Sequence, residues 1–257
     1  MILLTAGAAL TIYVCADFLF TTIGGTPSRF LSFRIARTLF AAFRWLPDRD
    51  FRHIAVGPVA MSMVALWWVA GIGIGWGMIF AGFEHAVVIS KSGAPAGFFG
   101  ALSHAGHLLS TVGGGRTEAS NLVFACLGVV CAVNGMVVLT LSVSFVLSTT
   151  QTVSNGRGLL LLRRVIGPEH GDYIGAVLPQ LATLVAQLNT APFALFYSHP
   201  DPSMRLPRQL VEAFGRDQPA LTLLGNLPQS PEPTTEGLRR WARSYRLSPP
   251  DGARAER

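Results

Sequence analysis

Apolar positions are gathered into three long stretches. The first runs from Met1 to about Ile23 and contains one charge, Asp17, while residues 54–83 and 121–152 contain none. At ~1.5 Å per residue each stretch can cross ~30 Å of hydrocarbon. The first stretch lacks the basic leader and short apolar run of a signal peptide. The pattern therefore predicts three transmembrane helices, at 1–24, 54–83 and 121–152.

The segment 27–53 has a different pattern. Between Pro27 and Leu46, phenylalanine and leucine alternate with arginine at helical spacing. This pattern is typical of an amphipathic helix lying along the inner membrane face. An ordinary cytoplasmic loop helix is an equally good alternative.

A shorter apolar segment lies between the second and third stretches. Residues 97–110 are mostly apolar but too few to cross a bilayer. The glycines 113–115 follow at once and favour extended or positive-φ backbone over helix. We therefore predict a re-entrant loop, in which a short helix enters the membrane and the chain turns back. Such backbone must be covered by protein or line a water-filled cavity.

Composition supports a membrane protein. The chain is 50% hydrophobic and 13% charged, against roughly 25% charged residues in soluble domains. Hydrolase elbow, P-loop, dinucleotide and His-Glu-x-x-His signatures are absent from the sequence. We therefore do not expect an enzyme. The basic excess, 20 Lys and Arg against 14 acids, accompanies no nucleic-acid motif, so no nucleic-acid partner is expected.

The placement of the basic residues predicts orientation. The first loop holds six arginines, and the tail from residue 155 holds twelve basic residues against nine acids. The second loop has Lys91 and Arg116, balanced by Glu84 and Glu118. The positive-inside rule then places the first loop and the tail in the cytoplasm, and the N-terminus and second loop outside. The expected location is the inner (plasma) membrane, with several spans.

Two groups of small residues lie within the spans. Cys15, Cys126 and Cys131 all fall in apolar stretches and are interpreted as packing residues. In the second span, Gly71 and Gly75 form one small-xxx-small pair, and Gly73 and Gly77 form another. These faces predict close helix packing, either across subunits or within one chain.

The segment Thr111-Val112-Gly113-Gly114-Gly115 resembles the Thr-Val-Gly-Tyr-Gly selectivity filter of potassium channels. In that family four filters direct backbone carbonyls at a central axis and replace the hydration shell of K⁺. The resemblance implies that Thr111 supplies the innermost carbonyl and hydroxyl. It also implies that Val112, Gly113 and Gly114 supply further carbonyls and that Gly115 forms the outer end.

The resemblance extends over about residues 1–155, to bacterial two-transmembrane potassium-channel-like proteins with an additional N-terminal helix. The family's inner helix often has a hinge about twenty residues beyond the filter, which implies that Gly135 is a gating hinge. Asn134 is expected either to line the cavity below the filter or to hydrogen-bond a neighbouring helix. The resemblance implies a homotetramer in the lipid bilayer, with no cofactor besides a permeating monovalent cation, K⁺.

Two residues depart from the family's pattern. Gly114 stands where the family has a tyrosine or phenylalanine, and Arg116 stands where it usually has an aspartate. At the outer mouth, four copies of Arg116 would oppose cation entry unless Glu118 offsets them or Arg116 points away. These departures favour an alternative, in which the chain is a non-conducting membrane sensor or scaffold that acts through its cytoplasmic tail.

Other polar residues in the apolar regions have structural and functional interpretations. His104 and His107 share a helix face, with His85 near the same side, and packed histidines are favoured over a metal site or a pH sensor. They would also be needed for a third possibility, a membrane enzyme, which lacks a nucleophile. Asp17 is expected to pair with an arginine of the first loop or to lie at the inner interface.

The expected fold is an all-α membrane protein with three transmembrane helices, a re-entrant pore helix with a filter loop, and a mostly helical cytoplasmic tail. The pore domain covers 54–153, with its pore helix at 97–110, its filter at 111–115 and its inner helix at 121–152. A helical region at 154–225 follows, with helices at about 172–189 and 206–214. Residues 226–257 are expected to lack order. The alternative for the arginines of this last segment is that they bind anionic lipid headgroups. The sequence does not identify a ligand or cytoplasmic partner of the tail.

Overall fold

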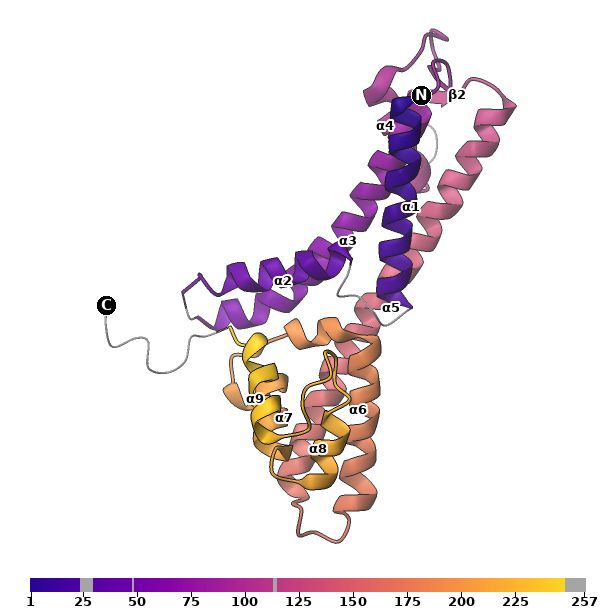
Figure 1. The fold of residues 1–257 in the computed structure, drawn as a ribbon. Helices are drawn as coiled ribbons and strands as arrows, with labels where there is room; N and C mark the ends of the chain where they lie inside the picture. The colour runs from indigo at the N-terminus through magenta and orange to yellow at the C-terminus, as the bar shows by residue number, and fades with distance from the viewer. Residues whose placement is uncertain (24–29, 48, 113–114, 248–257) are drawn as a thin grey trace. The chain divides into compact units, whose positions relative to one another are not determined.

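The computed structural model describes residues 1–23, 30–47, 49–112 and 115–247 (Figure 1). Three of the described helices are long and apolar enough to cross a membrane: α1 (Ile2–Thr22), α3 (Asp50–Ala81) and α5 (Leu122–Val165). The predicted class, an all-α membrane protein with three spans, is confirmed. Helix α5 continues beyond the predicted end at residue 152 without a break.

The remaining elements are short. Among the described residues, two strands pair antiparallel, β1 (Val87–Ile89) with β2 (Thr117–Ala119), and Val88 lies opposite Glu118. The other helices and helical turns are α2 (Leu31–Phe43), α4 (Gly97–Leu109), η2 (Tyr173–Val177), α6 (Leu178–Thr190), η3 (Pro192–Phe196), η4 (Pro202–Met204), α7 (Leu206–Phe214), α8 (Gln218–Leu224) and α9 (Thr235–Ser244).

The chain divides into two compact units. We call residues 1–22 and 64–144 the membrane unit, and residues 23–63 and 145–257 the tail unit. Helices α3 and α5 each contribute residues to both units. Each unit is described by itself.

Glycines bring α1 close to α3 within the membrane unit. A Cβ added at Gly7 would lie 2.8 Å from the carbonyl oxygen of Gly75, and one added at Gly71 would lie 2.8 Å from a methyl of Val14. The pair Gly71 and Gly75 therefore serves packing within one chain, which was one of the two predicted roles. On the same helix, Gly73 and Gly77 face α4 instead.

Asp17 is fully buried in α1. Its carboxylate accepts hydrogen bonds from Trp67 Nε1 at 2.7 Å and from Thr21 Oγ1 at 3.3 Å. Burying a carboxylate is costly unless hydrogen-bond donors surround it. The hydrogen bond from the Trp67 indole therefore fixes the position of α1 along α3. The sequence pointed to an arginine or the interface and did not identify this tryptophan.

The tail unit has an aromatic core around η3. Phe193 packs edge-on against Phe33 and Phe145, with ring centroids 5.8 and 5.2 Å apart, and Phe196 contacts Phe40 at 5.4 Å. The buried residues of α2 recur at helical spacing and face this core: Ser32, Phe33, Ala36 and Phe40. Because protein covers this face, the structure favours the alternative of a loop helix over a helix whose apolar face enters the membrane.

The end of the described chain is also ordered. Helix α9 begins at an N-cap, where the Thr234 side chain accepts a hydrogen bond from Gly237 N. Leu238 and Trp241 are buried, and so is Leu247 beyond the helix. The expectation that 226–257 lacks order is therefore wrong for residues 226–247, while 248–257 lie outside the described residues. The helices expected at about 172–189 and 206–214 are confirmed by η2 with α6 and by α7.

Candidate functional site: the re-entrant loop

Helix α4 lies against both α3 and α5 in the membrane unit. A Cβ at Gly77 would meet Leu102 at 2.8 Å, and one at Gly135 would meet the backbone of Leu109 at 2.7 Å. Leu109, the last residue of α4, also lies near Gly73. Gly73 stands about 12 Å below the end of α3, and Gly135 about 20 Å below the start of α5. For a hydrocarbon layer ~30 Å thick that begins at these two helix ends, the end of α4 would lie well inside it.

Helix α4 ends next to a residue with a strained backbone conformation. Ser110 N still donates to Gly106 O at 3.0 Å, and Thr111 N donates to Leu108 O at 3.2 Å. Thr111 has a φ of 57°, a left-handed conformation that normally belongs to glycine at this position after a helix. For a β-branched residue this conformation costs roughly 1–2 kcal/mol. Strain of this kind is typical of functional segments.

Beyond α4 the backbone is no longer helical. Thr111 and Val112 are exposed in the single chain, and the Val112 side chain is 75% accessible. At this depth, non-helical backbone needs covering protein or water to satisfy its polar groups. Gly113 and Gly114, the next two proposed filter residues, lie outside the described residues.

The chain returns beside α4. A Cβ at Gly115 would lie 2.7 Å from His107 Nε2, so a larger residue here would require the His107 ring to move. Farther out, His104 Nδ1 and Thr117 Oγ1 form a hydrogen bond at 3.2 Å, and both residues are buried. The two histidines therefore connect the descending helix to the returning segment. This favours the packing interpretation over a metal site.

Other candidate ligands do not gather here. In the part of the chain that the structure describes, no three His, Cys, Asp or Glu side chains come together as metal ligands. His85 is exposed before β1.

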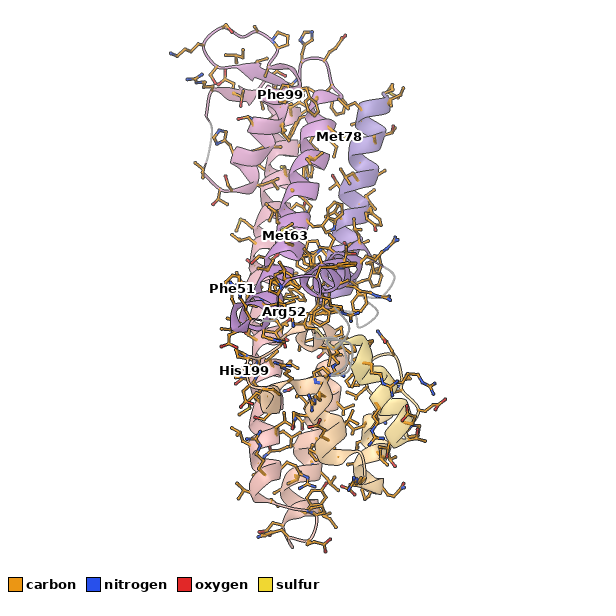
Figure 2. The ribbon with its side chains drawn as sticks, turned by 90° about the vertical axis from the view of Figure 1, so that its left-hand side faces the viewer. Phe51, Arg52, Met63, Met78, Phe99 and His199 are labelled. Carbon is orange, nitrogen blue, oxygen red and sulfur yellow. The ribbon has the colours of Figure 1, made fainter. Side chains whose placement is uncertain are left out.

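Arg116 and Glu118 lie at the outer end of the returning segment. Arg116 is exposed, and its carbonyl accepts a hydrogen bond from Ser90 N at 3.0 Å. Glu118 is the exposed central residue of β2. Figure 2 shows Phe99, in the first turn of α4, at the same end of the membrane unit as the strands. Both charged side chains are therefore exposed at the end of the membrane unit that carries the two strands.

The structure gives Asn134 and Gly135 packing roles. Asn134 Oδ1 accepts from Trp76 Nε1 at 3.1 Å, and Asn134 Nδ2 donates to Cys15 Sγ at 3.5 Å. The asparagine thereby joins α5, α3 and α1, which favours hydrogen bonding between helices over lining a cavity. Gly135 lies within the unbroken helix α5 and accommodates Leu109. Its distance from the filter in the sequence predicted a gating hinge. The contact with Leu109, which the sequence does not show, indicates that Gly135 also leaves space for the end of α4.

Helix α5 leaves a wide apolar surface uncovered. Only 22% of its most apolar window is buried within the chain, against 50% for α3. The exposed apolar side chains in the N-terminal half of the helix are Leu122, Val123, Val129, Val130, Val133, Met136, Val137, Leu139 and Val143. This surface requires lipid or further protein around it.

Comparison with known proteins supports membrane character. No protein-family model and no solved structure match the chain. An uncharacterized membrane protein of Bacillus subtilis (strain 168), YdjJ, is 24% identical over 223 residues, which cover 77% of this chain and 61% of the relative. The chain thus spans about three fifths of that curated relative. The comparisons do not support membership of the potassium-channel family.

Proposed function

We propose that this chain is one subunit of a tetrameric membrane pore that conducts monovalent cations, with K⁺ as the first candidate. The re-entrant loop supplies the ion pathway, and residues 111–115 supply its carbonyl oxygens. The N-terminus and the loop between α3 and α5 lie outside the cell, and the tail unit lies in the cytoplasm. This is a binding and transport function without a chemical reaction.

The observation that carries the proposal is the depth at which α4 ends. Leu109 packs against Gly73 and Gly135, which lie within the two long apolar helices, and Thr111 and Val112 are exposed just beyond it. This supports a loop that ends inside the apolar layer. The described part of a single chain leaves these two residues uncovered. Four copies around an axis would enclose it and let its carbonyls face a water-filled path. The uncovered apolar surface of α5 is available to contact neighbouring copies.

Flux measurement tests conduction directly. Purified protein in liposomes should pass K⁺ or Rb⁺ and should form tetramers in detergent or nanodiscs. Arg116→Asp should raise cation flux, because it replaces four positive charges at the mouth by four negative ones. Lys91→Asp is the matched control: it makes the same charge change on an exposed residue after β1, and it should change flux little. A monomer or dimer would exclude the pore.

Arg116 supports a second candidate, a non-conducting scaffold that uses the same fold for oligomerisation. It is exposed at the outer end of the loop, where its charge opposes cation entry. In this case wild-type liposomes show no flux, while the double variant Gly114→Tyr/Arg116→Asp conducts. Absence of flux in both proteins would refute the pore hypothesis. Flux in the wild type would refute the scaffold.

A further inference from the structure

The tail unit contains a cavity with a strongly basic lining. Its volume is about 360 Å³. Among the described residues, one carboxylate, Glu212, lines it together with five arginines: Arg205, Arg208, Arg239, Arg243 and Arg246. So many guanidinium groups around one cavity are typical of sites for phosphate or carboxylate groups, because arginine matches their oxygens with two parallel hydrogen bonds.

The arginines are held by different partners. Arg205 donates from Nε to His199 O at 2.8 Å and from Nη2 to Pro200 O at 3.0 Å. Both of these acceptors are neutral carbonyl oxygens. Arg208 forms an ion pair with Glu212 at 2.6 Å.

The α9 arginines share one carboxylate that lies outside the cavity lining. Glu236 lies 3.0 Å from Arg243 and 3.9 Å from Arg239. Among the described residues that line the cavity or pair with its lining, there are five arginines and two carboxylates, Glu212 and Glu236. The excess positive charge favours an anion in the cavity.

Apart from His53 and Ser198, the rest of the described lining is apolar or aromatic. Tyr197, Pro207, Val211, Tyr245 and Leu247 form this part of the wall. Small-molecule sites commonly combine such a wall with a few charged groups, at volumes of ≈ 300–1,000 Å³. The cavity therefore has room for an organic group attached to the anion.

We propose that this cavity binds a phosphate-bearing organic anion. The arginines of α7 and α9 hold the phosphate, and the tyrosines cover the organic part. A soluble nucleotide and the headgroup of an anionic phospholipid share this chemistry. The site does not depend on whether the re-entrant loop conducts ions.

A ligand bound in the cavity would contact the segment Tyr197–Ser198, which is joined to both α3 and α5. Ser198 Oγ and His53 Nδ1 form a hydrogen bond at 2.8 Å, and Arg157 of α5 donates to Ser198 O at 3.0 Å. Figure 2 labels Phe51 and Arg52, which precede His53 in the first turns of α3, and His199, which follows Ser198. The Tyr197 ring also lies against Gly57 of α3. His53 and Ser198 both line the cavity, so a bound anion would lie next to the hydrogen bonds that connect this segment to α3 and α5.

The test compares the full-length protein with three variants. Arg239→Gln/Arg243→Gln removes two lining charges. Arg240→Gln is the matched control, because Arg240 is on the same helix but does not line this cavity. Glu212→Gln removes the negative charge of the lining and should raise affinity, a gain that misfolding cannot produce. Binding of ATP and of inorganic pyrophosphate is measured by calorimetry in phosphatidylcholine nanodiscs. Thermal unfolding is compared in nanodiscs with and without phosphatidylglycerol.

We expect the double variant to weaken binding at least tenfold, Arg240→Gln to change it less than twofold, and Glu212→Gln to strengthen it several-fold. If this pattern appears with ATP or pyrophosphate, the ligand is soluble. If it appears instead as a stabilisation by phosphatidylglycerol that the double variant loses, the ligand is a lipid headgroup. The proposal is overturned if neither probe has an effect, or if Arg240→Gln loses as much as the double variant.

Discussion

The contact between Gly135 and Leu109 makes a specific prediction about the position of α4. A Cβ at Gly135 would lie 2.7 Å from both the Cα and the carbonyl oxygen of Leu109. Ordinary contact begins at about 3.4 Å, so Gly135→Ala must push the end of α4 away by roughly 0.7 Å or bend α5. The opposing atoms are backbone, which cannot rotate aside. We therefore expect displacement of the residues that follow, Thr111 and Val112.

The energetic cost can be bounded. Overpacking a tight interior costs typically 1–3 kcal/mol, and replacing a helical glycine by alanine returns up to about 1 kcal/mol through helix propensity. The net destabilisation of Gly135→Ala should then be about 0–2 kcal/mol. Two other glycines of α5 calibrate this figure. A Cβ at Gly128 would meet only the end of the Leu108 side chain, at 3.3 Å, and Gly158 has nothing within 4 Å.

Thermal unfolding of the three alanine variants in one detergent is the assay, combined with liposome flux for the proteins that conduct. Gly158→Ala should be as stable as the wild type or more so, Gly128→Ala close to it, and Gly135→Ala the least stable with altered flux. If Gly135→Ala is as stable as Gly158→Ala, the backbone contact with Leu109 does not constrain α4. Altered gating with undiminished stability would then restore the hinge interpretation.

Three further predictions concern the packing of the two units. Trp67→Phe removes a donor from the buried carboxylate of Asp17 and should cost about 1.5–3 kcal/mol in unfolding free energy; an unchanged thermal midpoint would contradict this. Phe193→Ala empties the centre of the aromatic core and should cost about 3–5 kcal/mol, whereas Phe193→Leu should cost less than half as much, as measured by denaturation of the purified protein. Burial, and then a hydrogen bond to Asp217, raise the pKa of Tyr173 from 10.0 to about 12. The neutral phenol therefore stabilises the fold below pH 10, and this contribution is lost as the pH rises toward about 12. Tyr173→Phe should make the free energy of unfolding decrease less steeply between pH 10 and about 12. If this free energy decreases equally steeply in both proteins, Tyr173 does not contribute in this way.

Sequence patterns were sufficient for the elements whose apolar residues follow one rule. Charge-free stretches predicted three spans, and a short apolar run before glycines predicted α4 at 97–110, close to its observed bounds of Gly97–Leu109. These predictions succeed because length and polarity alone decide whether a helix crosses a bilayer.

Pairwise contacts were not predictable in the same way. The sequence shows that Asn134 is polar and that Gly135 is small, but not that they meet Trp76 and Leu109. The basic cavity was also missed, because its arginines come from α7, α9 and the segments beside them, and only the fold brings them together. The packing of helix α9 into the tail unit was not predicted, because its buried residues are few and are separated by arginines.

The electrostatics of the outer mouth bear on both candidate functions. For a cation about 10 Å from each of four Arg116 charges, Coulomb repulsion in water sums to about 1.7 kcal/mol, and Glu118 opposes part of it. Screening at 0.15 M salt reduces the sum several-fold, so in the proposed tetramer these charges would slow cation entry without forbidding it.

Arg116→Asp changes eight charge units around a tetrameric mouth. By the same estimate it should raise K⁺ flux about fivefold at 0.15 M salt and about fiftyfold near 0.01 M. Measuring the ratio of variant to wild-type flux across this range tests whether Arg116 faces the ion path. A ratio independent of salt would mean that the side chain points away, and Gly114 would then be the departure that decides whether the pore conducts.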